Sequence, residues 1–187
     1  MNLVAQASYI LAIVLFISET TFAEGLSKDP CENTVIPKEV LQLVTDRFPS
    51  WHVLRFSDLY PDRQEDWLRS QYREQCPGIA AGHFETKASL SHAMLLIPND
   101  KTKNSFRLVV VHSKHGRLDL KVLIDAPCHN CRWHDEVVYR LPPGKYEDFY
   151  QEKTIVLTNE GFQWETSKGA WLFYWKKGQY HKIITSD

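Results

Sequence analysis

The sequence has almost no excess of charge of either sign. It carries 22 Lys and Arg residues against 23 Asp and Glu residues, which gives a net charge of −1. A nucleic-acid-binding surface needs a basic field, and a polybasic membrane surface needs clustered Lys and Arg. The balance therefore predicts no nucleic-acid partner and no polybasic role at a membrane surface.

Long apolar runs are also scarce. Residues 9–17 (YILAIVLFI) are too few to cross a bilayer as a helix, but they match the apolar part of a secretory signal. Ala23, with Thr21 two places earlier, is the predicted last residue of that signal. No Lys or Arg precedes the run, so an uncleaved anchor is the alternative. We expect a signal peptide over residues 1–23, no stable membrane insertion after its cleavage, and a periplasmic or secreted location.

Signature motifs of several enzyme classes are missing. The sequence has no G-x-S-x-G nucleophile turn, no cysteine-nucleophile signature and no glycine-rich phosphate loop. The neighbouring carboxylates Asp135 and Glu136, like Glu147 and Asp148, would point to opposite faces of an extended chain. We interpret both pairs as solvated surface and not as an acid–base pair. We predict no catalytic residue, which favours a protein that is not an enzyme.

Cysteine occurs only four times, at Cys31, Cys76, Cys128 and Cys131. An even number of cysteines in an exported chain favours disulfides, and four cysteines allow three connectivities. We predict the pairs Cys31–Cys76 and Cys128–Cys131, because this connectivity leaves no thiol unpaired and needs no thread through the sheet.

The segment 128–134 keeps two alternatives open. A redox C-x-x-C motif would begin a helix, whose dipole lowers the pKa of the first thiol, but the residues that follow have a loop and strand pattern. Together with His134, Cys128 and Cys131 form a C-x-x-C-x-x-H pattern that zinc would accept if a fourth ligand were present. We predict no cofactor, with zinc as the alternative.

Two helices are predicted in the N-terminal half. Pro37 is suited to the first helical position, apolar residues follow at helical spacing, and Pro49 ends the helix. Residues 51–59 alternate between apolar and polar and predict a strand. Pro61 opens a second, highly charged helix over residues 62–75, which Gly78 helps to end.

The remainder of the chain predicts antiparallel strands separated by turn residues, with no crossover helices. We therefore predict an α+β fold, in which two N-terminal helices pack on a long antiparallel β-meander that disulfides cross-link. Residues 24–187 would form a single domain. The predicted strands cover residues 79–84, 92–97, 106–111, 118–124, 137–141, 154–157, 162–166, 170–175 and 179–184.

Residues 82–84 are Gly-His-Phe, and residues 93–96 are Ala-Met-Leu-Leu. This pattern, within residues 76–97, resembles the strand–loop–strand unit of FG-GAP-type repeats of β-propellers, where loop oxygens hold calcium. One carboxylate beside a lysine cannot supply the roughly six to eight oxygens that calcium takes. The resemblance therefore implies two strands and a turn without a calcium site, and it identifies no family for the whole chain. In this sequence, the positions that correspond to the calcium ligands of that family are occupied by His83, Glu85, Lys87 and Ser91.

Aromatic residues are abundant, with six Trp, eight Tyr and nine Phe. Such side chains anchor binding surfaces, although filling a β-rich core is the alternative. Near the C-terminus, both faces of one predicted strand carry aromatic residues, so one face would pack in the core. The other face would either meet the helices or lie open, and an open face would be a binding surface. The predicted aromatic surface consists of Trp164, Trp171, Phe173, Trp175 and Tyr180.

These observations favour an exported, non-enzymatic binding domain with a protein partner. An inhibitor or immunity protein for an enzyme of the same compartment would have these properties. The alternatives are a metal- or redox-active protein centred on residues 128–134, and a structural component of the cell envelope. The sequence leaves the oligomeric state open.

Overall fold

The computed structural model of the protein describes residues 29–100, 102–114, 116–127 and 133–186. Eleven strands in antiparallel sheets make up 48% of it, and helices make up only 19%. The prediction of an α+β fold with one long meander is therefore wrong, because the protein is mostly β. Among the described residues, neither α-helix is long and apolar enough to span a membrane.

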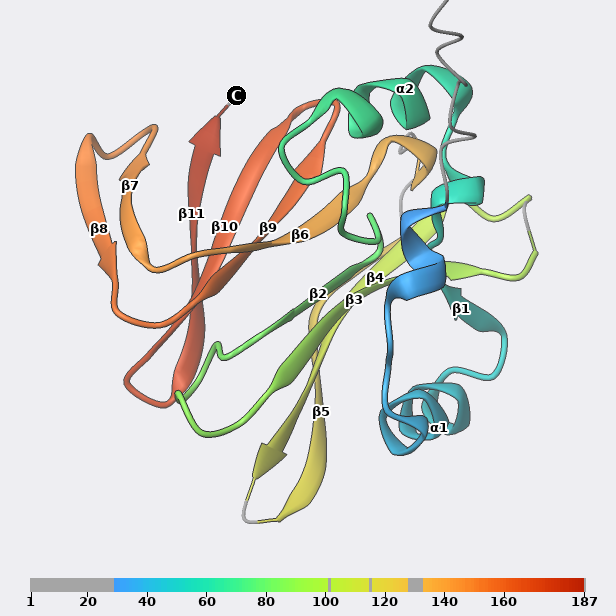
Figure 1. The fold of residues 1–187 in the computed structure, drawn as a ribbon, viewed down its shortest axis with the longest axis horizontal. Coiled ribbons are helices and arrows are strands. Elements are labelled where there is room, and N and C mark those ends of the chain that lie inside the picture. Colours follow the sequence, from blue (N-terminus) through green and yellow to red (C-terminus); the bar gives the residue numbers. More distant parts are fainter. Residues whose placement is uncertain (1–28, 101, 115, 128–132, 187) are drawn as a thin grey trace, which may run out of the picture.

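The first sheet has five strands, in the order β1-β3-β4-β5, with β2 also paired to β3 (Figure 1). All of its pairs are antiparallel, and the β4–β5 hairpin turns at Gly116, whose φ of 75° favours glycine. The strands are β1 (Trp51–Val53), β2 (Ile79–Gly82), β3 (Ser91–Pro98), β4 (Ser105–Lys114) and β5 (Arg117–Pro127).

The second sheet has four strands in the order β11-β10-β9-β6, and a third sheet is the hairpin β7–β8. The hairpin forms the left edge of the molecule in Figure 1. The strands are β6 (Val137–Leu141), β7 (Gly144–Asp148), β8 (Lys153–Leu157), β9 (Gly161–Thr166), β10 (Gly169–Lys176) and β11 (Gln179–Ser186).

The two larger sheets meet at one joint. Gly78 and Val138 form an isolated parallel bridge, and the Val138 N–H donates to the Pro77 carbonyl at 2.6 Å. The backbone of Leu54 passes so close to Gly78 that a Cβ atom there would lie 1.9 Å from the Leu54 carbonyl oxygen. Only glycine fits this approach, so the joint depends on that residue.

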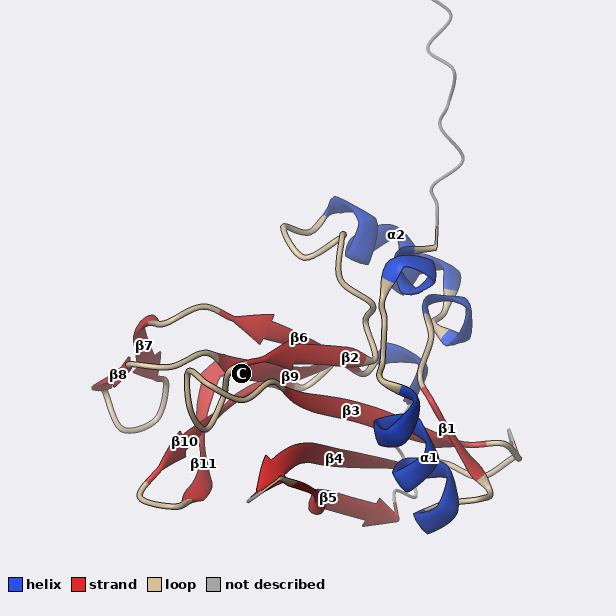
Figure 2. Ribbon diagram, turned by 60° about the horizontal axis from the view of Figure 1, so that its bottom comes forward, coloured by secondary structure: helices blue, strands red, loops and turns tan. Residues whose placement is uncertain are grey.

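The main core lies between the two sheets (Figure 2). It contains aromatic contacts that join the sheets, such as the tilted ring pairs Phe84–Phe162 and Phe106–Trp164, with ring centroids 5.0 and 5.3 Å apart. Burial of such rings is the main stabilising contribution of the interior. The largest fully buried side chains are Phe84, Phe106, Phe162, Leu54, Met94, Leu95, Leu96, Ile97, Leu108, Leu172 and Val109.

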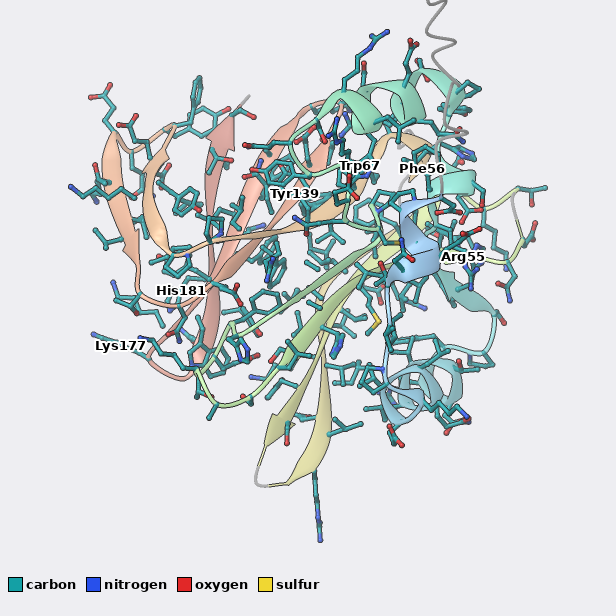
Figure 3. All side chains as sticks on the ribbon, viewed as in Figure 1. Arg55, Phe56, Trp67, Tyr139, Lys177 and His181 are labelled. Carbon is teal, nitrogen blue, oxygen red and sulfur yellow. A yellow bond between two sulfur atoms is a disulfide. The ribbon has the colours of Figure 1, made fainter. Side chains whose placement is uncertain are left out.

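Helix α2 (Pro61–Arg69) covers the outer face of the four-stranded sheet. Its Trp67 ring lies beside Tyr139 of β6, with centroids 5.8 Å apart, and Tyr72 stacks on Tyr139 at 3.9 Å (Figure 3). The helix ends six residues before the predicted position, because the backbone N–H and the hydroxyl of Ser70 both donate to the Trp67 carbonyl. Strand β6 is consequently buried on both faces.

Helix α1 (Lys38–Arg47) covers the outer face of the five-stranded sheet. Val40 and Val44 pack there on Met94, Val109 and neighbouring residues in a second apolar cluster. The predicted Cys31–Cys76 disulfide is confirmed, and both cysteines belong to this cluster. Cys128 and Cys131 lie outside the described residues, so their predicted pairing stays a prediction. In the part of the chain that the structure describes, three short 3-10 helices complete the elements, at Pro30–Asn33, Phe56–Asp58 and Trp133–Asp135.

Most strand predictions are confirmed, and β6 has the predicted bounds. The strand predicted over residues 51–59 ends at Val53, because the chain turns into the 3-10 helix Phe56–Asp58. Strand β7 was not predicted, because Pro142, Pro143 and Gly144 indicate a break. Here the two prolines precede the strand, and β7 begins at Gly144 itself.

Candidate functional site

The β7–β8 hairpin, residues 144–157, is a projecting element that we call the arm. It carries three of the most exposed large apolar side chains of the described residues: Val156 (63% exposed), Tyr150 (61%) and Phe149 (55%). The rings of Phe149 and Tyr150 meet edge to face, with centroids 5.4 Å apart. An aromatic pair is thereby displayed at the tip of the arm.

The tip has a defined conformation. The buried carboxylate of Asp148 accepts hydrogen bonds from the N–H groups of Tyr150 and Gln151 at 3.2 and 3.3 Å. This is the turn that an aspartate side chain forms with its own backbone. The Phe149 N–H donates to the Ile184 carbonyl of β11 at 2.7 Å, which fastens the tip to the four-stranded sheet. The backbone that carries the aromatic pair is therefore held in place by hydrogen bonds.

A pocket of about 400 Å³ lies beside the base of the arm. Residues 154–160 form one wall, residues 174–176 form the other, and Phe84 contributes to the lining. Tyr174 also stacks on His181 of β11, with centroids 5.7 Å apart (Figure 3). Its aromatic lining residues are Phe84, Tyr174 and Trp175, and its volume lies in the range of ligand pockets.

A buried polar cluster lies next to this pocket. The carboxylate of Glu85, 7% exposed, accepts hydrogen bonds from the hydroxyls of Ser91 and Tyr180. Burial, reinforced by the charge of Glu85, raises the pKa of Tyr180 well above its ordinary value. Tyr180 is thus a permanent hydrogen-bond donor that joins β11 to the loop before β3.

His112 extends the polar cluster towards β5. Its Nδ1 lies 3.8 Å from the Glu85 carboxylate, and its Nε2 lies 3.6 Å from that of Asp119. These separations are too long for hydrogen bonds, and Nδ1 is buried without a hydrogen-bond partner. Ser91 directs its hydroxyl to Glu85 and is fully buried. The cluster therefore holds the two sheets together at this end and does not present a nucleophile to a base.

A second buried carboxylate, Glu136, lies at the other end of the molecule. It is 4% exposed, and the indole N–H of Trp164 donates to it at 2.6 Å. Burial raises its pKa to about 8; the charge of Asp135 acts in the same direction, and the hydrogen bond from Trp164 opposes it. The prediction of solvated carboxylate pairs is therefore wrong for Glu136 and for Asp148.

The residues of the predicted aromatic surface do not gather on one open face. Trp164 and Phe173 are buried, whereas Trp171, Trp175 and Tyr180 are partly buried. Trp171 stacks on Trp164 at 4.6 Å, and Phe173 stacks on Phe162 at 5.2 Å. Of this set, only Trp175 lines the pocket beside the arm.

The alternative metal ligands are only partly placed. Cys128 and Cys131 lie outside the described residues. Nδ1 of His134 lies 2.7 Å from the Asp58 carbonyl oxygen, and its ring lies 4.3 Å from that of Tyr60. The described residues contain no group of three or more His, Cys, Asp or Glu side chains arranged to hold a metal ion.

Comparison of the chain with models of known protein families, with curated proteins and with solved structures gives no match. The two strands and the turn that the FG-GAP-type resemblance implies are present as β2 and β3. The loop between them contributes Glu85, which contacts Ser91. Glu85 and Ser91, two of the four residues at the compared calcium-ligand positions, are therefore hydrogen-bonded to each other.

The arm was not among the candidate sites predicted from the sequence. Its signals were the adjacent aromatics Phe149 and Tyr150 directly after Asp148, at a position where an aspartate favours a turn. Glu85 and His112 were also missed as partners, because a contact between two segments that are distant in the chain leaves no local pattern.

Proposed function

We propose that the protein is an exported, non-enzymatic binding domain that recognises a protein partner through the arm. The observation that carries this proposal is the tip of the arm, where Phe149 and Tyr150 are more than half exposed on a turn that Asp148 fixes. Large exposed aromatic side chains are enriched at the energetic centres of protein interfaces.

The fixed conformation of the arm tip supports recognition by an element that is already formed before binding. A tip that is already hydrogen-bonded to β11 loses little conformational freedom on binding, so more of the contact energy appears as affinity. Pre-organised complexes, inhibitors with their enzymes among them, change little in backbone on association. An enzyme of the same compartment, with a cleft that receives the aromatic tip, is the partner we propose. The protein would then act as its inhibitor or immunity protein.

The proposed compartment is the periplasm or the extracellular space. The Cys31–Cys76 disulfide supports an oxidising environment, in which such bonds persist. The proposed signal peptide over residues 1–23 would deliver the chain there.

The test uses the protein with its disulfide intact as bait for exported proteins. We compare the wild type, the double variant Phe149→Ser/Tyr150→Ser and the control Leu41→Ser, which removes an exposed apolar side chain from α1. The expected result is a stoichiometric partner that binds the wild type and the control alike. Its affinity for the double variant should be at least about tenfold lower, since each aromatic anchor contributes about 1 kcal/mol or more.

The activity of the captured partner is measured with increasing amounts of each bait. Inhibition that saturates at a one-to-one ratio with the wild type, and weakens in parallel with binding by the double variant, supports the proposal. A partner that binds all three baits equally would contradict recognition through the arm.

A further inference from the structure

Strand β5 is the last strand of the five-stranded sheet. Within the described residues it pairs with β4 alone, through ten of its 11 residues. Figure 2 shows it at the border of the sheet, with no described element on its far side. A long, unpaired strand edge offers its backbone N–H and C=O groups to another strand.

The side chains of β5 alternate in chemistry as well as in direction. Leu118, Leu120 and Val122 face the side of α1, where Leu118 is 39% and Val122 is 43% exposed. Asp119 and Lys121 face the opposite side, where Lys121 lies 5.0 Å above the Trp175 ring. The edge therefore combines an apolar row with one acidic and one basic residue.

We propose that β5 pairs with β5 of a second copy of this chain, in an antiparallel register with Leu120 opposite itself. A two-fold axis perpendicular to the sheet always places one residue of the strand opposite its own copy. With Leu120 on the axis, Asp119 of each chain lies opposite Lys121 of the other. Leu118 of each chain then lies opposite Val122 of the other, so the two exposed apolar side chains cover each other.

The neighbouring registers are disfavoured by charge. Centring the pair on Lys121 places this lysine opposite itself, and centring it on Asp119 places two aspartates together. Opposed like charges destabilise a strand pair, whereas opposed unlike charges and apolar pairs stabilise it. At the other end, Leu123 lacks a Cα partner in β4, because the pairing passes from Ile124 to Val122 at a bulge. The regular part of the edge is therefore centred close to Leu120.

The paired strands would make one continuous sheet across two chains. The arm belongs to a different sheet and lies on another side of the molecule, so both arms would stay free (Figure 1). A dimer could then engage two partner molecules, or one two-fold symmetric partner with a gain in avidity.

Charge reversal tests this register. Sedimentation equilibrium is measured for the wild type, for Asp119→Lys and Lys121→Asp singly, and for the double exchange. The expected result is a wild-type dimer, at least tenfold weaker association for each single variant, and recovered association for the double exchange. Lys182→Asp, on an exposed position of β11, is the matched control and should leave the dimer unchanged.

Two results would overturn the proposal. One is a wild type that stays monomeric up to about 100 μM. The other is a dimer that the single reversals do not weaken, which would place its interface elsewhere. Because Asp119 and Lys121 also contact His112 and Trp175, a reversal could unfold the chain. Hydrogen exchange of the wild type covers that case: amides of residues 117–122 must exchange more slowly as protein concentration rises, and exchange independent of concentration would likewise overturn the proposal.

Discussion

Glu136 is an acid that burial keeps in its neutral form, against the hydrogen bond from Trp164. It is buried beside the Trp164 indole, which donates a hydrogen bond to it at 2.6 Å. Its pKa of about 8 lies well above the ordinary value of 4.5. The folded chain therefore holds this proton over a pH range in which the unfolded chain has already released it.

The consequence is a loss of stability as pH rises. Below about pH 4.5 both states are protonated, and this residue makes no difference between them. Between that value and about pH 8 the unfolded state ionises first and becomes relatively more stable, so the free energy of unfolding falls. The stability linked to Glu136 is thus present in acid and lost as pH passes through the folded-state pKa.

We predict that Glu136→Gln removes this pH dependence. The glutamine amide oxygen can still accept the hydrogen bond from Trp164, and it never ionises. The variant should match the wild type at about pH 4 and exceed its free energy of unfolding by on the order of 5 kcal/mol at about pH 9. Urea unfolding at both pH values measures the difference, with Glu147→Gln on the exposed face of β7 as the control. Parallel pH profiles for wild type and variant would contradict the assignment.

At the scale of elements, periodicity predicted where most strands lie. Val137, Leu141 and their neighbours form a strand with the predicted bounds, because apolar residues bounded by turn residues have few other local solutions. Periodicity could not tell which strands share a sheet. The way the sheets join depends on contacts such as the bridge between Gly78 and Val138, residues that are 60 positions apart in the chain, so no local pattern reports it.

The candidate site was missed for a related reason. Exposure decides whether an aromatic residue binds a partner or fills the core, and the sequence does not report exposure. Trp164 and Phe173 are residue types common in binding surfaces, but their rings stack inside the protein. The side chains of Phe149 and Tyr150 are instead exposed on the surface. The disulfide Cys31–Cys76 could be predicted, because only three pairings of four cysteines exist.

The close approach of Leu54 to Gly78, at the joint between the two sheets, can be tested by a single substitution. Gly78→Ala places a Cβ atom on the Leu54 carbonyl, so the backbone must move and the bridge to Val138 is strained. We expect a loss of at least about 3 kcal/mol in the free energy of unfolding. Gly144→Ala is the control, because its Cβ would meet nothing closer than 3.5 Å, and it should cost less than about 1 kcal/mol. Equal urea midpoints for the two variants would show that the joint tolerates a side chain.

At the scale of the whole molecule, two sheets enclose one aromatic core and each outer face carries a helix. Hydrogen-bonded polar groups lie at both ends of this core, with Glu85 and Tyr180 at one end and Glu136 and Trp164 at the other. These groups shield both ends of the core from solvent. The arm projects from the two sheets and carries exposed apolar side chains (Figure 1). A rigid body that carries one prepared, exposed aromatic tip is the physical basis of the proposed function.

Hydrogen exchange of the complex with the captured partner tests that claim most directly. The account predicts slower exchange of the amides of the arm tip and of the pocket wall, residues 149–158, with no change in helix α1. Protection of α1 or of the outer face of α2, with the arm exchanging as fast as in the free protein, would contradict it.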